Sequence, residues 1–108
     1  MKFSQSVLVT LLFFISVSFA HAESAAYELA QRYGCMACHS AKEELIGPSF
    51  KAIADKYRSD ADAKNKLIAK LKAGGSGVWG VKVQPAYRDE IKNQQHYGVL
   101  IDWVLSQH

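Results

Sequence analysis

Hydrophobic residues beyond position 22 recur mainly at intervals of three and four, the spacing of a helix with one buried face. They form four sets: Ala26, Leu29, Ala30 and Tyr33; Phe50, Ile53 and Tyr57; Leu67, Ile68 and Leu71; and Tyr97, Leu100, Ile101, Val104 and Leu105. The alternation of polar and apolar residues that is typical of a strand is not sustained anywhere. We therefore expect an all-α fold of four to five short helices, the last beginning near Asn93 or Gln94.

Glycine and proline residues predict where these helices begin and end. Gly34 ends the first helix, and Pro48 can be the first residue of the second. The Ser-Asp-Ala-Asp segment at 59–62 resembles a capping box at the start of the third helix, which Gly74 ends. Between residues 74 and 93, several glycines and a proline favour turns and extended chain over helix.

The first 22 residues have the features of a secretory signal peptide. Lys2 precedes a mainly apolar run over residues 7–20, and Ala20-His21-Ala22 fits an A-x-A cleavage site. The run is shorter than the about 20 residues that a membrane span needs, although an uncleaved N-terminal anchor is the alternative. We expect export to the periplasm, removal of residues 1–22, and one domain over residues 23–108 with no stable membrane anchor.

The segment Cys35-Met36-Ala37-Cys38-His39 is a C-x-x-C-H pentad, the attachment signature of a c-type haem. Its two thiols add to the haem vinyl groups, and the histidine that follows is placed to bind the iron from one side. A thioredoxin-like redox pair would need a βαβ setting, which the pattern does not predict. A structural zinc site would need four ligands, and a disulfide across two residues would be strained. The pentad therefore predicts one covalent haem c.

The charge balance gives no case for nucleic acid binding. Loss of Lys2 with the leader leaves 12 basic and 10 acidic residues, and two haem propionates bring the protein close to neutral. The basic residues do cluster in one segment, at Lys64, Lys66, Lys70 and Lys72. This cluster is either an ordinary solvated helix face or a surface that steers the protein toward an acidic partner.

Four segments together resemble the short class I cytochromes c of bacteria, small monohaem electron carriers of the periplasm. They are Gly34-Cys35-Met36-Ala37-Cys38-His39, Ile46-Gly47-Pro48, Gly77-Val78-Trp79-Gly80 and Trp103-Val104-Leu105-Ser106-Gln107. The pentad is common to many haem proteins, whereas the Gly-Val-Trp-Gly segment ahead of a C-terminal helix is more specific. The resemblance covers nearly all of residues 23–108 and implies a cytochrome c-like fold of helices around the haem.

The resemblance also implies roles for single residues. His39 would bind the iron through Nε2, and the carbonyl of Pro48 would accept the hydrogen bond of its Nδ1–H group. Trp79 would donate its indole N–H to a haem propionate, and Lys70 would lie against a propionate. Each residue also has a plainer interpretation: Pro48 as a helix start, Trp79 as a core aromatic, and Lys70 as a solvated helix residue.

The second axial ligand departs from the family pattern. Gln84, followed by proline, stands where the family has the distal methionine, and the chain's two methionines lie in the leader and inside the pentad. Gln84 could bind through its amide oxygen, or the position could hold a water molecule or nothing. Lys82 as a neutral amine and His96 or His108 are the other candidates. An oxygen ligand is harder than a thioether and favours ferric iron, which predicts a low reduction potential.

Electron transfer to redox partner proteins is the function that the resemblance favours, and we expect no enzymatic activity. The alternative is a sensor or carrier that binds a small ligand such as NO or CO at a labile distal position. Peroxidase-like catalysis is the weakest candidate, because it needs a distal acid-base group that a glutamine does not supply.

Overall fold

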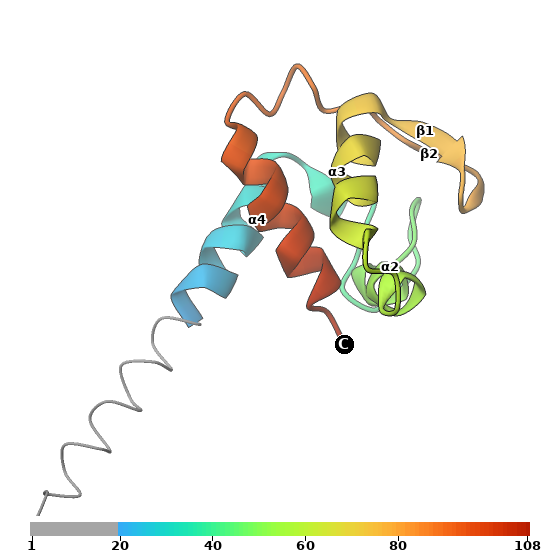
Figure 1. Ribbon diagram of the computed structural model, residues 1–108, viewed down its shortest axis with the longest axis horizontal. Coiled ribbons are helices and arrows are strands. Elements are labelled where there is room, and N and C mark those ends of the chain that lie inside the picture. Colours follow the sequence, from blue (N-terminus) through green and yellow to red (C-terminus); the bar gives the residue numbers. More distant parts are fainter. Residues whose placement is uncertain (1–19) are drawn as a thin grey trace, which may run out of the picture.

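The computed structural model describes residues 20–108, which form four α-helices, a short 3-10 turn and one two-stranded sheet (Figure 1). In chain order these elements are the N-terminal helix (residues 20–32), η1 (Cys35–Ala37), α2 (Phe50–Tyr57), α3 (Ala63–Ala73), β1 (Gly75–Gly77), β2 (Gly80–Gln84) and α4 (Gln94–Leu105). The mostly helical fold agrees with the expectation from the hydrophobic pattern. Most of the predicted signal peptide lies outside the described residues, so its cleavage stays a prediction.

Helix α4 is the centre of the packing. It contacts both α2 and α3 and lies beside the N-terminal helix (Figure 1). Its buried face consists of Tyr97, Leu100, Ile101 and Val104, the stripe that the sequence predicted. The N-terminal helix contributes buried alanines rather than large residues, so its backbone can approach α4 closely.

Two predicted helix ends are confirmed. Gly34 follows the N-terminal helix with φ 73°, and Gly74 ends α3 with φ 68°. Both values lie in the left-handed region, which glycine enters without steric cost.

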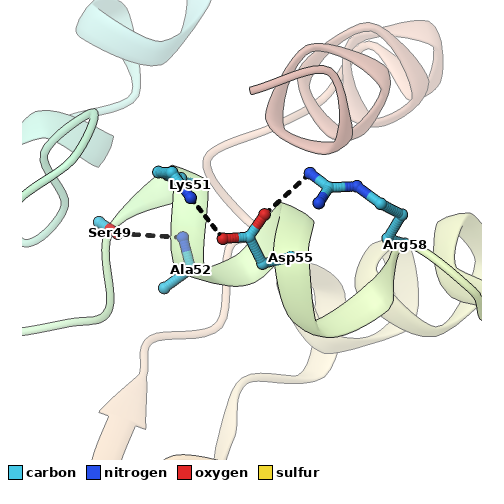
Figure 2. A network of polar contacts seen from close by, with 5 residues as sticks. All are labelled: Ser49, Lys51, Ala52, Asp55 and Arg58. Carbon is cyan, nitrogen blue, oxygen red and sulfur yellow. Dashed lines mark hydrogen bonds and ion pairs between the residues drawn. The ribbon is translucent and has the colours of Figure 1, made fainter. Parts of the chain in front are cut away.

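The start of α2 differs from the prediction. The helix begins at Phe50, and Ser49 rather than Pro48 governs its start, since the Ser49 hydroxyl accepts a hydrogen bond of 3.0 Å from the Ala52 N–H (Figure 2). Pro48 therefore lies one residue before the N-cap and not inside the helix. A serine at the N-cap satisfies one of the amide groups that a helix leaves free at its start.

The predicted capping box at 59–62 is wrong. Helix α3 begins at Ala63, and its N-cap residue Asp62 makes no capping hydrogen bond through its side chain. Instead, the carboxylate of Asp60 accepts the Asp62 N–H at 2.9 Å and an ion pair from Lys66 at 2.7 Å. The aspartates thus stabilise a local turn before the helix, a use of Asp that competes with capping.

The segment after α3 contains a β-hairpin that the sequence analysis described only as turns and extended chain. Strands β1 and β2 pair antiparallel, with Gly75 opposite Gln84 and Gly77 opposite Gly80. Strand β1 reads Gly-Ser-Gly, so it has no side-chain alternation from which pairing could be predicted. The hairpin projects from the helices at the end of the molecule away from the N-terminal helix (Figure 1).

Candidate haem site

A pocket opens between the helices and the hairpin. Residues from each described helix and from both strands line it, and most of the lining side chains are apolar. Cys35, Cys38 and His39 contribute to one wall, and Gln84 contributes to another. A mainly hydrophobic pocket with a few convergent polar groups is the usual form of a cofactor site, and it suits the apolar ring of a haem.

The two cysteines have the chemistry that covalent attachment needs. Both are free thiols, half-buried at the pocket, in and just after the turn η1. Burial raises the pKa of the Cys35 thiol, and the neighbouring Cys38 raises it further. Free thiols are therefore available at the pocket wall for thioether formation.

A hydrogen bond to the backbone fixes the orientation of the His39 ring. Its Nδ1 lies 2.6 Å from the carbonyl oxygen of Pro48, so the expected hydrogen bond is present. Because a carbonyl can only accept, Nδ1 carries the proton and Nε2 of the neutral ring keeps its lone pair. That lone pair is the one required for a metal bond through Nε2.

Gly47 makes this arrangement sterically possible. A Cβ atom at position 47 would lie 2.7 Å from Cε1 of His39 and 3.0 Å from its Nδ1, closer than real carbon contacts allow. The Gly47 N–H also donates to the carbonyl of Cys38 at 2.8 Å. Gly47 belongs to the Ile46-Gly47-Pro48 segment of the family pattern, from which no role for the glycine itself was predicted. Its Gly-Pro context gives no indication that a histidine ring packs against it.

Gln84 faces His39 across the pocket. Its Oε1 lies 3.4 Å from Nε2 of His39, while its amide nitrogen donates to the carbonyl of Pro85 at 3.2 Å. With Nδ1 of His39 protonated, both facing atoms are acceptors, so this approach is not a hydrogen bond. Two lone pairs that converge on one gap are the arrangement that a metal ion satisfies.

The gap is close to the size that an ion needs. Metal bonds to imidazole nitrogen or to oxygen of about 2.0–2.2 Å each would separate the two donors by about 4 Å. The observed separation of 3.4 Å is about 0.6–1.0 Å shorter than the sum of two such bonds, a shift that side-chain rotation can supply. The residues present therefore fit a haem iron between His39 and Gln84.

The chain beyond Gln84 is held against the end of α3. At Gly74 a Cβ atom would lie 2.7 Å from the carbonyl oxygen of Gln84 and 2.8 Å from the amide nitrogen of Ala86. The Tyr87 N–H donates to the carbonyl of Leu71 at 2.7 Å. These close backbone contacts fix the position of Gln84 relative to the end of α3. Gly74 therefore has a role beyond ending the helix.

Trp79 and Lys70, the residues predicted to meet the propionates, are both half-buried and both line the pocket. The ammonium group of Lys56 lies 5.5 Å from the centre of the Trp79 ring, a cation–π distance. Proximity to the pocket is the geometry that both roles require, and the roles themselves stay predictions.

The other candidate iron ligands are engaged elsewhere or lie outside the pocket lining. Lys82 lines the pocket, but its ammonium group pairs with Glu44 at 2.8 Å. His96 is not among the lining residues; its Nδ1 lies 2.7 Å from the Tyr33 hydroxyl and its Nε2 lies 3.2 Å from the Asn93 amide. His108 is exposed and also absent from the lining.

The predicted lysine cluster is largely compensated within the molecule. Lys64 pairs with Asp102 at 2.9 Å, Lys66 pairs with Asp60, and the Lys72 ammonium group lies 4.9 Å from the centre of the Tyr97 ring. Most of the charge on α3 therefore has an intramolecular partner, which favours the plainer interpretation of a solvated helix face.

Comparisons with known proteins agree with this geometry. The family model described as "Cytochrome c" matches residues 24–107. Cytochrome c-551 of Allochromatium vinosum is 43% identical over 72 residues, which cover 67% of this chain and 77% of that protein. Cytochrome c-552 of Hydrogenobacter thermophilus is 37% identical over 101 residues, covering 93% and 94% of the two chains. The crystal structure of Nitrosomonas europaea cytochrome c552 superimposes with a TM-score of 0.69 at 35% identity, covering 76% of this chain and 99% of that one.

Proposed function

Because this chain belongs to the cytochrome c family, we propose that His39 and Gln84 are the two axial ligands of its haem iron. The chain is a monohaem electron carrier with one covalently bound haem c. The single observation that supports Gln84 as the distal ligand is its Oε1 atom, 3.4 Å from Nε2 of His39 with both lone pairs directed into the gap.

The haem supplies one-electron redox chemistry, and the chain supplies its attachment and tuning. Cys35 and Cys38 hold the ring covalently. His39, fixed by the carbonyl of Pro48, provides a strongly oriented nitrogen donor. The amide oxygen of Gln84 is a hard donor that stabilises the ferric state, whereas the methionine of ordinary relatives raises the potential. The protein thus works as an electron carrier of lower potential than His/Met cytochromes.

The propionate contacts belong to the same proposal. Trp79 and Lys70 are half-buried at the pocket, and they would donate to the two haem carboxylates. A charge-assisted hydrogen bond from each would hold the ring at a fixed tilt and partly neutralise its anionic edge.

We also propose that the protein works in the periplasm, as residues 23–108 after removal of residues 1–22. The A-x-A site and the preceding apolar run support export. Among residues 20–108, no helix is both long and apolar enough to cross a membrane. Redox proteins are its partners, and electron exchange with them needs no catalytic residue.

The alternative of a small-ligand sensor has no support. The relatives described above are named as cytochromes c-551 and c-552, and the family model is that of cytochrome c.

A Gln84→Met variant tests the axial ligand directly. Axial ligands tune haem potentials over about 0.8 V, so we expect the reduction potential to rise by on the order of 0.1 V or more. The measurement is a redox titration of the haem protein followed by its optical spectrum. Gln95→Met is the matched control, because Gln95 is exposed at the start of α4 and absent from the pocket lining. An unchanged potential in Gln84→Met would exclude Gln84 as a ligand.

A further inference from the structure

Four aromatic rings form a continuous file from the proximal histidine to the protein surface. The His39 and Phe50 rings are stacked with centroids 5.2 Å apart and planes at 30°. The Phe50 and Trp103 rings follow at 5.0 Å and 63°, and the Trp103 and Tyr27 rings at 6.1 Å and 66°. Tyr27, at the outer end, is 46% exposed.

The file runs through the helical part of the molecule, and its outer end lies on the N-terminal helix. Its members come from the pentad, from α2, from α4 and from the N-terminal helix, whereas β1 and β2 project at the other end of the molecule (Figure 1). Phe50 is 3% exposed and Trp103 is half-buried at the pocket wall. Centroid distances of 4.5–7 Å are ordinary for packed aromatic pairs. The series leads without a break from His39 to an exposed ring.

We propose that this file is an electron-transfer path, joining the proximal side of the haem to the surface at Tyr27. The proposal rests on the proposed function, because it takes His39 as an iron ligand. Contacts between π systems couple a donor to an acceptor better than the same distance of saturated side chain. In each transfer one electron leaves the reduced protein and reduces a one-electron oxidant at the Tyr27 surface. No bond forms or breaks, no proton moves, and the rings end unchanged.

The test uses the haem-loaded protein with a photo-oxidant attached beside Tyr27. Gln31 is exposed and lies one turn further along the same helix, so a Gln31→Cys variant puts a thiol on the same face. Haem attachment consumes Cys35 and Cys38, which leaves that thiol as the labelling site for a ruthenium polypyridyl complex. A light flash with a quencher oxidises the ruthenium, and absorbance then reports the rate of haem oxidation.

Trp103 is the link to vary. A Trp103→Leu substitution should slow haem oxidation from the Gln31 label about tenfold, which corresponds to about 1.4 kcal/mol of barrier. Trp103→Phe keeps a ring in the file and should retain most of the rate. The haem absorption spectrum of each variant checks that the pocket is intact.

The matched control is a label on the opposite side. Val81 is 94% exposed on β2, and the residues that follow it, Lys82 and Val83, line the pocket, so a Val81→Cys label reaches the haem without the file. Its rate should be the same with and without Trp103→Leu. The path would be overturned if haem oxidation from the Gln31 label were equally fast with Trp103 and with Trp103→Leu. It would also be overturned if Trp103→Leu slowed oxidation from the Gln31 and Val81 labels by the same factor. If the Val81 label oxidised no haem, the proposed function as an electron carrier would be overturned, and the path would be overturned with it.

Discussion

At the scale of single residues, the iron site depends on groups that have no redox chemistry of their own. The Pro48 carbonyl decides which nitrogen of His39 carries the proton, and Gly47 leaves the space in which the His39 ring lies. Gln84 is oriented in a similar way, since its amide nitrogen donates to the Pro85 carbonyl. The two atoms that face each other across the pocket, Nε2 of His39 and Oε1 of Gln84, thus each have their direction set by an adjacent piece of backbone.

A Gly47→Ala substitution should therefore damage the proximal side. The added methyl would meet His39 at 2.7 Å, and relieving such an overlap costs about 1–3 kcal/mol. We expect denaturant unfolding of the haem protein to show a loss of stability in that range.

Gly98→Ala is the matched control for this experiment. Gly98 lies inside α4, and a Cβ there would meet only the end of the Lys64 side chain at 3.7 Å. Alanine should stabilise the helix at this position by about 0.5–1 kcal/mol. Equal effects at positions 47 and 98 would contradict the steric role of Gly47.

At the scale of elements, the start of α2 supports the proximal side of the site. The Ser49 hydroxyl caps the helix, and Asp55, nearly two turns further on, pairs with Lys51 at 2.6 Å and with Arg58 at 2.8 Å (Figure 2). Pro48 directly precedes the N-cap residue Ser49. A well-ordered helix start therefore keeps the Pro48 carbonyl in the position where it accepts the hydrogen bond from His39.

Ser49→Ala should lower stability by about 0.5–2 kcal/mol, the usual cost of losing an N-cap. Ser59→Ala is its control, since Ser59 resembles a cap in the sequence but α3 begins only at Ala63. A change at position 59 should stay within about 0.5 kcal/mol, as for other surface substitutions. Thermal unfolding of both variants gives the comparison, and an equal loss in both would contradict the assignment of Ser49 as the cap.

The ion pairs of α2 predict a dependence on pH. The hydrogen bond from Lys51, with a smaller contribution from Arg58, lowers the pKa of the Asp55 carboxyl. Its pKa in the folded protein therefore lies below the unfolded value of about 3.9. The contribution of the ionised Asp55 to folding stability is therefore fully present above about pH 4, and it is lost as the pH falls through the folded pKa. An Asp55→Asn variant should be less stable than the parent near neutral pH, and the difference should narrow on acidification. A difference that is constant from pH 7 to pH 2 would show that the carboxylate charge is not involved.

At the scale of the whole molecule, the protein part of the core is thin. Four of the ten buried hydrophobic residues are alanines, and Tyr97 and Ile91 are the largest fully buried side chains among the described residues. Small domains commonly need an additional constraint to fold stably. In this chain a covalent haem in the pocket that every described helix lines would act as part of the core.

A double Cys35→Ala, Cys38→Ala variant should therefore lose most of its folded structure together with the covalent haem. Far-ultraviolet circular dichroism and thermal unfolding would follow the change. The single variant Cys35→Ala is the control, because one thioether can still retain the ring. A cooperative unfolding transition in the double variant without haem would show that the protein core suffices.

Much of the site could be predicted from the sequence because its signals are local. The pentad fixes the cofactor through five consecutive residues, and the stripe on α4 fixes its buried face through helical spacing. The hairpin was missed because Gly-Ser-Gly has no pattern to read. The capping prediction at Ser59 was wrong because Asp60 uses its carboxylate for a turn instead.

The sequence by itself determined the haem, the helical class and the absence of a distal methionine. Only the tertiary structure decided that Gln84 faces His39 across 45 residues of chain, that Gly47 must lack a side chain, and that aromatic rings connect His39 to Tyr27. The physical reason is the range of the interactions. Attachment motifs and helix periodicity act between near neighbours in the chain, whereas axial ligation and ring contacts depend on how separate elements pack.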